Sequence, residues 1–382
     1  MLVVLATFSA NVAAAALSAD STVANLVFTG STNTFSAAST LANDGTLQFG
    51  DATGDSFTFN GGLTTSDVGG TVTLNTSIST SNDALVFGAI TLGNNITLDT
   101  NATNTTGDLT IGAVTGGSNT LTLTTENNIA NADITASGNI SGVTTLTLTS
   151  VGGTATFAGD VDVTTLAVGN TVANVAINGN GSTITNDIDF ANDGTLQLGD
   201  ATGDTLTFNG GLDTSDVGGT VTLNGTIDTS NDAITFGAVT LGSATTIDTN
   251  ATNTTGDLTI GAVTGGSNTL TLTTENNIAN ADITASGNIS GVTTLTLQNV
   301  GGTATFAGDV DVTTLTVGNT VANVALNGDG STVTNTVSFA NDGTLQLADA
   351  TGDTLTFNGG VTTTGVGGTV TLNGTINASD DA

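Results

Sequence analysis

Aspartates recur at fixed places in the sequence and are the side chains best suited to bind a ligand. The segment LANDGTLQFGDATGD begins at residue 41 and returns, nearly unchanged, at residues 190 and 339. DATGD lies between two strand-like phrases, so we expect a turn that presents two carboxylates and backbone carbonyls. Hard cations such as calcium bind about six to eight oxygen ligands of this kind. The candidate calcium ligands are Asp44, Asp51, Asp55, Asp193, Asp200, Asp204, Asp342, Asp349 and Asp353.

A second interpretation of these aspartates needs no metal. Aspartate is common in turns because its side chain accepts hydrogen bonds from nearby backbone N–H groups, and a charge beside a strand opposes aggregation. The sequence contains neither the EF-hand loop nor the glycine-rich nonapeptide of calcium-binding β-rolls. Calcium ligand and turn former therefore both stay open.

Groups for catalysis are scarce. The chain has no His, Cys or Lys, so its many Ser and Thr residues have no partner base of the usual kind. The best-placed carboxylate pair is Asp160 with Asp162, which recurs as Asp309 with Asp311; a spacing of two puts both members on one face of a strand. Paired carboxylates can hydrolyse a glycosidic bond. Because a repeated active site is unusual, we expect no enzyme, and a polysaccharide-acting enzyme is the lesser alternative.

The charge of the chain limits its partners. The 382 residues carry a formal net charge of -33 and include no Lys, Arg or His. The chain therefore has no cationic side chain that could bind the phosphates of a nucleic acid or an anionic membrane surface, and we expect neither nucleic acids nor membranes as partners. No apolar run reaches the ~18 residues that suggest a membrane span. The carboxylates must be hydrated or neutralised by external cations, which favours an extracellular or cell-surface location.

The elements that would position these residues are short strands. Phrases such as GTLQFG at residue 45, GTVTLN at 70 and NTLTLTT at 119 alternate apolar residues with Thr, which is the period of a strand. NG, DG and GG pairs between them are typical of turns. Long segments of the sequence repeat with a period of 149 residues, as the segments that begin at Phe190 and Phe339 and those that begin at Asn101 and Asn250 show. We expect a divergent partial repeat or cap at 1–40, repeat units at 41–189 and 190–338, and a truncated unit at 339–382.

A parallel β-solenoid explains this organisation best. Each coil has an apolar face that it cannot bury alone, and stacking supplies the neighbour. Several apolar positions exchange with other apolar residues between copies, as Phe49 does with Leu198 and Leu347, which is the kind of substitution a packed core tolerates. A row of tandem β-sandwich domains is the alternative, because sandwiches also have short strands with frequent turns.

The strand phrases also resemble a known group of proteins. DLTIGAVTGGSNTLTLTTENNI, ASGNISGVTTLTL and GGTVTLNGTI are similar to segments of large bacterial exoproteins with β-strand repeats, among them filamentous-haemagglutinin-like adhesins and autotransporter passenger domains. The resemblance covers nearly the whole chain. It implies a right-handed parallel β-helix, export, and a role at the cell surface. We therefore expect an extended stalk, adhesin shaft or fibre that self-associates end to end or laterally, or else an adhesin that binds glycans or surfaces.

Overall fold

The computed structural model describes residues 5–104, 107–252 and 256–378, and within these ranges the regular structure is entirely β. The recorded strand pairs are parallel and join each strand to one in the next coil, as Leu47–Gln48–Phe49 pairs with Val72–Thr73–Leu74. A stack of parallel strands is a β-solenoid, so the expected fold is confirmed, whereas sandwich domains are built from antiparallel sheets. In the described part of the chain, no helix is long and apolar enough to cross a bilayer.

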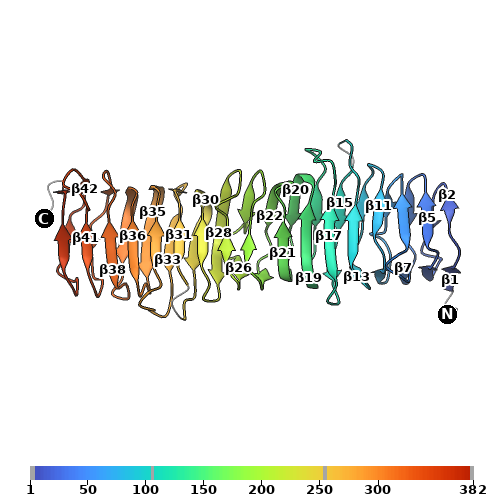
Figure 1. Ribbon diagram of the computed structural model, residues 1–382, viewed down its shortest axis with the longest axis horizontal. Coiled ribbons are helices and arrows are strands. Elements are labelled where there is room, and N and C mark those ends of the chain that lie inside the picture. Colours follow the sequence, from blue (N-terminus) through green and yellow to red (C-terminus); the bar gives the residue numbers. More distant parts are fainter. Residues whose placement is uncertain (1–4, 105–106, 253–255, 379–382) are drawn as a thin grey trace. The chain divides into compact units, whose positions relative to one another are not determined.

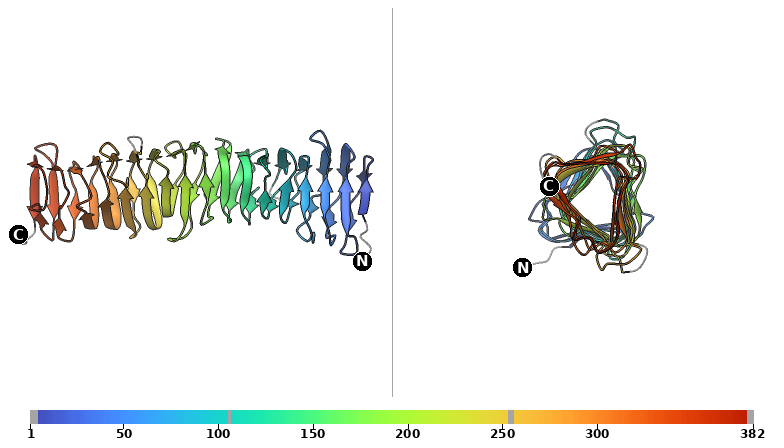
Figure 2. Two further views of the ribbon diagram at one scale, coloured as in Figure 1. Left: turned by 90° about the horizontal axis from the view of Figure 1, so that it is seen from below. Right: turned by 90° about the vertical axis from the view of Figure 1, so that its left-hand side faces the viewer.

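The chain divides into two compact units, which we describe separately. The first comprises residues 1–185 and 191–196, and the second residues 186–190 and 197–382. Figure 1 labels strands of both units. Seen end-on, the coils are three-sided (Figure 2). The strands of each unit accordingly form three faces, and the strands within each face are parallel. The divergent residues 5–40 contribute strands of the same kind as the rest.

In the first unit, every third strand as far as β18 belongs to the same face. One face contains β1 (Leu5–Phe8), β4 (Asn25–Phe28), β7 (Leu47–Phe49), β10 (Val72–Leu74), β13 (Ile90–Leu92) and β16 (Val114–Thr115). The next contains β2 (Ala13–Ala14), β5 (Thr32–Phe35), β8 (Ser56–Phe59), β11 (Ile78–Thr80), β14 (Ile96–Asp99) and β17 (Thr120–Thr124). The last contains β3 (Ser18–Ala19), β6 (Ser39–Leu41), β9 (Leu63–Thr64), β12 (Leu85–Val86), β15 (Leu109–Ile111), β18 (Ile134–Ala136), β20 (Val151–Phe157) and β22 (Val172–Ile177). β19 (Ile140–Thr149) and β21 (Val161–Val168) continue around a corner, and β23 (Thr183–Ile184) pairs with β21.

The second unit has the same three-faced organisation. We call the faces X, Y and Z. Face X contains β26 (Thr205–Phe208), β33 (Thr269–Thr273), β40 (Val337–Ser338) and β43 (Val361–Thr362); face Y contains β32 (Val263–Thr264), β39 (Thr332–Val333), β42 (Thr354–Phe357) and β45 (Thr375–Ala378). Four longer strands turn the corner and belong to both X and Y: β28 (Val221–Thr229), β30 (Val239–Asp248), β35 (Ile289–Gln298) and β37 (Val310–Val317). Face Z contains β24 (Ile188–Asp189), β27 (Leu212–Asp213), β29 (Ile234–Phe236), β31 (Leu258–Ile260), β34 (Ile283–Ala285), β36 (Thr303–Phe306), β38 (Asn323–Leu326), β41 (Leu345–Leu347) and β44 (Val370–Leu372). β25 (Leu196–Leu198) holds the last residue of the first unit and the next two of the second.

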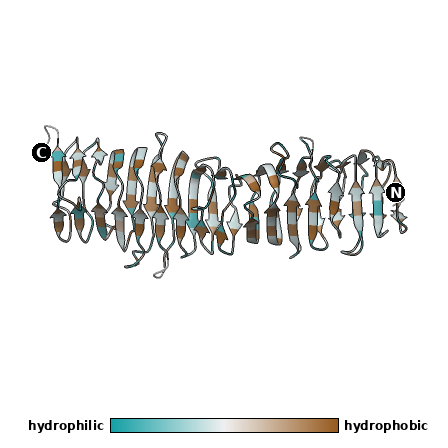
Figure 3. Ribbon diagram, turned by 45° about the horizontal axis from the view of Figure 1, so that its top comes forward, coloured by the Kyte–Doolittle hydropathy of each residue, from teal (hydrophilic) through white to brown (hydrophobic). Residues whose placement is uncertain are grey.

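The interior of each unit is built from the alternate residues of the strands, which are buried. Figure 3 shows the corresponding alternation of hydrophobic and more polar residues along the strands. In-register pairing stacks like on like: Phe28 lies over Phe8 with ring centroids 4.8 Å apart, and Phe49 follows at 5.8 Å. Fully burying one such side chain contributes roughly 1.5–3 kcal/mol. The polar residues between them, mostly Thr, point outward because successive strand residues face opposite sides of the sheet.

In the second unit, the sequence repeat and the coil are out of phase. Leu212 in β27 pairs on face Z with Ile188 and Ile234, while its counterpart 149 residues later, Val361 in β43, pairs with Val337 on face X. The same shift carries Val221 of face Y to Val370 of face Z. One sequence repeat is therefore a whole number of strands but not a whole number of coils, so a repeated phrase returns on a different face.

Candidate binding grooves

The predicted calcium ligands of the DATGD turns are used to close the turn. Asp55 Oδ2 accepts hydrogen bonds from the backbone N–H groups of Asp51 and Ala52, at 2.9 and 3.1 Å. The same two bonds are accepted by Asp204 from Asp200 and Ala201, and by Asp353 from Asp349 and Ala350. Donation by Ala350 and then Asp349 lowers the pKa of Asp353, because these bonds favour the charged form of the carboxylate. This is the geometry that the turn-former interpretation predicts.

The remaining six predicted ligands do not gather around a common site. Asp51, Asp200 and Asp349 are exposed at the turns, and Asp44, Asp193 and Asp342 are exposed in the preceding turn. No group of three or more acidic side chains in the described residues could hold a metal ion together. One carboxylate oxygen of each turn is committed to backbone donors, so calcium binding by these nine residues stays a prediction.

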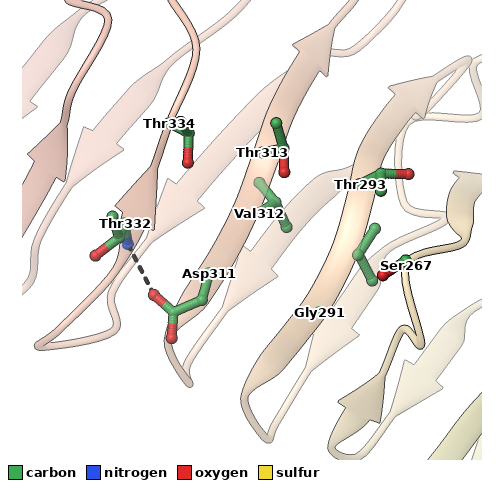
Figure 4. Close-up of a pocket in the computed structure, with 9 residues that line it drawn as sticks. Ser267, Gly291, Thr293, Asp311, Val312, Thr313, Thr332 and Thr334 are labelled. Carbon is green, nitrogen blue, oxygen red and sulfur yellow. Dashed lines mark hydrogen bonds between the residues drawn. The ribbon is translucent and has the colours of Figure 1, made fainter.

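A groove with an aspartate on its wall crosses four successive coils of the second unit (Figure 4). Its volume is about 390 Å³. It is lined by Ser267, Gly291, Val292, Thr293, Asp311, Val312, Thr313, Thr332 and Thr334. We call it the threonine groove. Ser267, Thr313 and Thr334 are exposed on its walls, while Val292 and Val312 are buried beneath it.

The groove forms where β35 turns a corner. The pairing of β35 with β37 shifts by one residue between Ser290 and Val292. Gly291 sits in this bulge with φ of +68°, a left-handed conformation that glycine adopts without steric cost. Because the extra residue carries no side chain, the wall drops to backbone there and leaves a dent between neighbouring coils.

Fixed hydrogen bonds hold the polar groups of the groove in place. Asp311 accepts a bond from the backbone N–H of Thr332 at 3.0 Å, from one coil to the next (Figure 4). Thr293 Oγ1 donates to the carbonyl of Asn268 at 3.1 Å. Thr side chains are also stiff at χ1, so the hydroxyls and methyl groups of the walls have few alternative positions.

The same groove occurs in the first unit. Every lining residue has a counterpart of the same type 149 positions earlier, namely Ser118, Gly142, Val143, Thr144, Asp162, Val163, Thr164, Thr183 and Thr185, around about 300 Å³. Desolvation and then the charge of Asp160 raise the pKa of Asp162, while the N–H of Thr183 lowers it. Nearby outward positions do change between the copies, as Asp187 becomes Thr336 and Asp189 becomes Ser338.

A second, smaller groove also recurs and includes two of the predicted calcium ligands. Asp193 lies in a hollow of about 180 Å³ in the first unit with Asn128, Asn170 and Thr171, and Asp342 occupies the corresponding hollow of about 210 Å³ in the second. Each hollow contains one carboxylate. Next to Asp193, the fully buried Asn192 donates to the carbonyls of Ala173, Gly194 and Thr195, so this turn is held by an amide that sequence reasoning did not single out.

The carboxylate pair considered for catalysis serves as a link between coils. Asp160 accepts bonds from the N–H of Gly181 at 2.9 Å and from Asn139 Nδ2 at 3.1 Å. Asp309 does the same with Gly330 and Asn288. Of each pair, only the second member, Asp162 or Asp311, lines the threonine groove.

The most perturbed carboxylate was not singled out from the sequence. Asp228 and Asp248 are register partners on adjacent strands of face X. Asp248 is only 9% exposed, and burial raises its pKa to about 6, with further contributions from Glu275 and Asp228. Oδ1 of Asp228 is buried with no hydrogen-bond partner. The signal was hidden because the two residues are 20 positions apart and meet only through coil stacking.

Comparisons with known proteins do not add an identity to this geometry. No protein-family model, no curated protein and no solved structure matches the chain. The assignment of function therefore depends on the fold, the two grooves and the charge of the chain.

Proposed function

We propose that the chain is a structural segment of an extracellular or cell-surface protein, a stalk, adhesin shaft or fibre. The observation that carries the proposal is the coil-to-coil ladder: in each unit, three faces of parallel strands pair in register from one coil to the next. Backbone hydrogen bonds in such a stack point along the direction of stacking. Each contributes about 0.5–1.5 kcal/mol net, and several act together between any two coils.

The surface chemistry supports the same function. Acidic side chains without any basic partner repel other copies of the chain, which opposes aggregation of long β-structures. External cations can screen or bridge these carboxylates, so lateral or end-to-end association would depend on the ionic medium. The resemblance to bacterial exoproteins with β-strand repeats agrees with a role outside the cell.

Small-angle X-ray scattering and negative-stain electron microscopy test this proposal. A compact globular chain of this length would have a radius of gyration of about 21 Å. We expect a clearly larger value, and images of elongated particles, with and without added calcium. Long uniform fibres would identify a filament subunit, and separate short particles a spacer within a larger protein. A radius of gyration near the globular value would rule out the stalk.

A further inference from the structure

The threonine groove is present in both units with the same lining. All nine lining positions have the same residue type in both units. Some of this agreement follows from the general similarity of the copies, but Thr183 and Thr185 lie in a stretch that varies: Ile184 becomes Val333, and Asp187 becomes Thr336. The outward residues Thr183 and Thr185 keep their type, whereas the outward residues Asp187 and Asp189 that follow them change to Thr336 and Ser338.

The walls of the groove define the chemistry of a ligand. They offer hydroxyl groups from Thr and Ser, one carboxylate, and patches of methyl and valine surface. Thr332 N–H engages one oxygen of Asp311, which leaves the second oxygen to accept a bond from a ligand hydroxyl. No aromatic ring lines either copy, so a flat apolar ligand would find no stacking partner.

The charge of the protein excludes one broad class of ligands. No Lys, Arg or His exists to neutralise a phosphate, sulfate or carboxylate, and the net charge of -33 repels such groups. A neutral molecule rich in hydroxyls avoids this repulsion. It can donate to Asp162 or Asp311, exchange hydrogen bonds with the threonines, and place C–H surface against their methyl groups.

We propose that the threonine groove, in both copies, binds a neutral glycan. The groove crosses four coils, and neighbouring coils are about 4.8 Å apart, so a short oligosaccharide can lie along it. The walls are rigid before binding, because their strands are paired on both sides and their β-branched side chains are stiff, which reduces the entropy lost on association. Charge-assisted hydrogen bonds from ligand hydroxyls to the aspartate are the strongest contacts available. This inference goes beyond the structural function proposed above and does not depend on it.

Titration of the full chain with defined sugars tests the groove. The probes are neutral oligomers of glucose, mannose and N-acetylglucosamine, with heparin as the anionic comparison, and the readout is isothermal titration calorimetry. We expect at least one neutral oligomer to bind with two sites per chain, and heparin not to bind. Absence of binding by every neutral oligomer, or binding of heparin alone, would overturn the proposal.

Matched variants locate the binding. The double variant Asp162→Asn with Asp311→Asn should bind about tenfold more weakly, and Thr164→Phe with Thr313→Phe, which fills both grooves from exposed positions, should abolish binding. Asp67→Asn with Asp216→Asn removes the same number of charges at exposed positions outside the grooves and should bind like the wild type. Thermal melting confirms that each variant is folded. Unchanged affinity in both groove variants would show that the sugar binds elsewhere and would refute the assignment. Scattering on the same samples reports separately on the stalk.

Discussion

Leu212 and Val361 occupy the same place in the 149-residue repeat but lie on different faces of the second unit, Z and X. The same sequence can form any of the three faces because each face requires the same pattern, an apolar residue that points inward at every second position. A repeat of this kind is free to end anywhere in the coil. The coil, and not the sequence repeat, is therefore the unit that must be kept whole.

Removal of one whole coil should be tolerated. Deleting residues 72–89 brings Ile90 into the place of Val72, opposite Leu47, and preserves the register of the following strands. We expect cooperative unfolding with a melting temperature lowered by only a few degrees, since a repeat stack is stabilised mainly by contacts between neighbouring coils. Differential scanning calorimetry measures the change.

A deletion confined to one side of a coil is the control. Removing residues 75–83 eliminates β11 but leaves β10 and β12, so that coil loses one face and its neighbours lose their ladder partners. This variant should be much less stable than the larger deletion. Equal stability of the two deletions would show that whole coils are not the structural unit.

Mutation of Ala348 to glycine should stabilise the folded chain. It has φ of +66°, whereas its counterparts Gly50 and Gly199 have φ of +76° and +73° at the same place in the repeat. A left-handed backbone costs a residue with a Cβ about 1–2 kcal/mol. Ala348→Gly should therefore raise the free energy of unfolding by about 1 kcal/mol, and Gly199→Ala should lower it. Chemical denaturation of the two variants checks the prediction, and a loss of stability in Ala348→Gly would contradict it.

Asp248 should make the second unit less stable as the pH rises through about 6. Its pKa is raised in the folded state to about 6, so the folded chain binds a proton more tightly than the unfolded chain. The stabilising contribution is complete below the unfolded pKa of about 4 and is lost between pH 4 and 6. Allowing for solvent screening, we expect a loss of about 1–2 kcal/mol.

The first copy supplies the matching variant. Asp228→Ser introduces the residue found at the corresponding position, Ser79, and removes the facing carboxylate of Asp248. The pH dependence should become smaller, although burial and Glu275 still act on Asp248. Asp248→Asn should abolish this part of the pH dependence. Thermal melts from pH 4 to 7 are the measurement, and an unchanged profile in Asp248→Asn would refute the assignment.

The two interpretations of the aspartates in the DATGD turns predict different responses to calcium. If Asp51, Asp200 and Asp349 contribute ligands, millimolar calcium should raise the melting temperature, and their triple mutation to Asn should remove the effect. If the turns only use Asp55, Asp204 and Asp353 as hydrogen-bond acceptors, calcium should act no more strongly than an equal concentration of magnesium. Isothermal titration calorimetry distinguishes the outcomes, and absence of heat at millimolar calcium would end the metal hypothesis.

The sequence by itself determined that the chain is built from short strands, because apolar residues alternate with Thr, and it favoured a parallel β-solenoid over tandem sandwiches because coils with one apolar face require stacking. The parallel pairing seen in the structure excludes the sandwich alternative. The turns were partly visible too, as the aspartates of the DATGD segments show. Coil length was not: register partners are 18 residues apart from Val72 to Ile90 but 26 apart from Val114 to Ile140, since corner loops vary freely at the surface.

Only the tertiary structure decided which outward residues meet. Asp228 lies beside Asp248, and Asp311 beside Thr332, because two different coil lengths happen to bring them into register. The threonine groove likewise depends on a bulge at Gly291, whose effect on the wall is set by the strands before and after it. Inward positions obey a local rule of alternation, so sequence predicts them. Outward contacts depend on the accumulated length of every loop between two coils, and no local pattern carries that information.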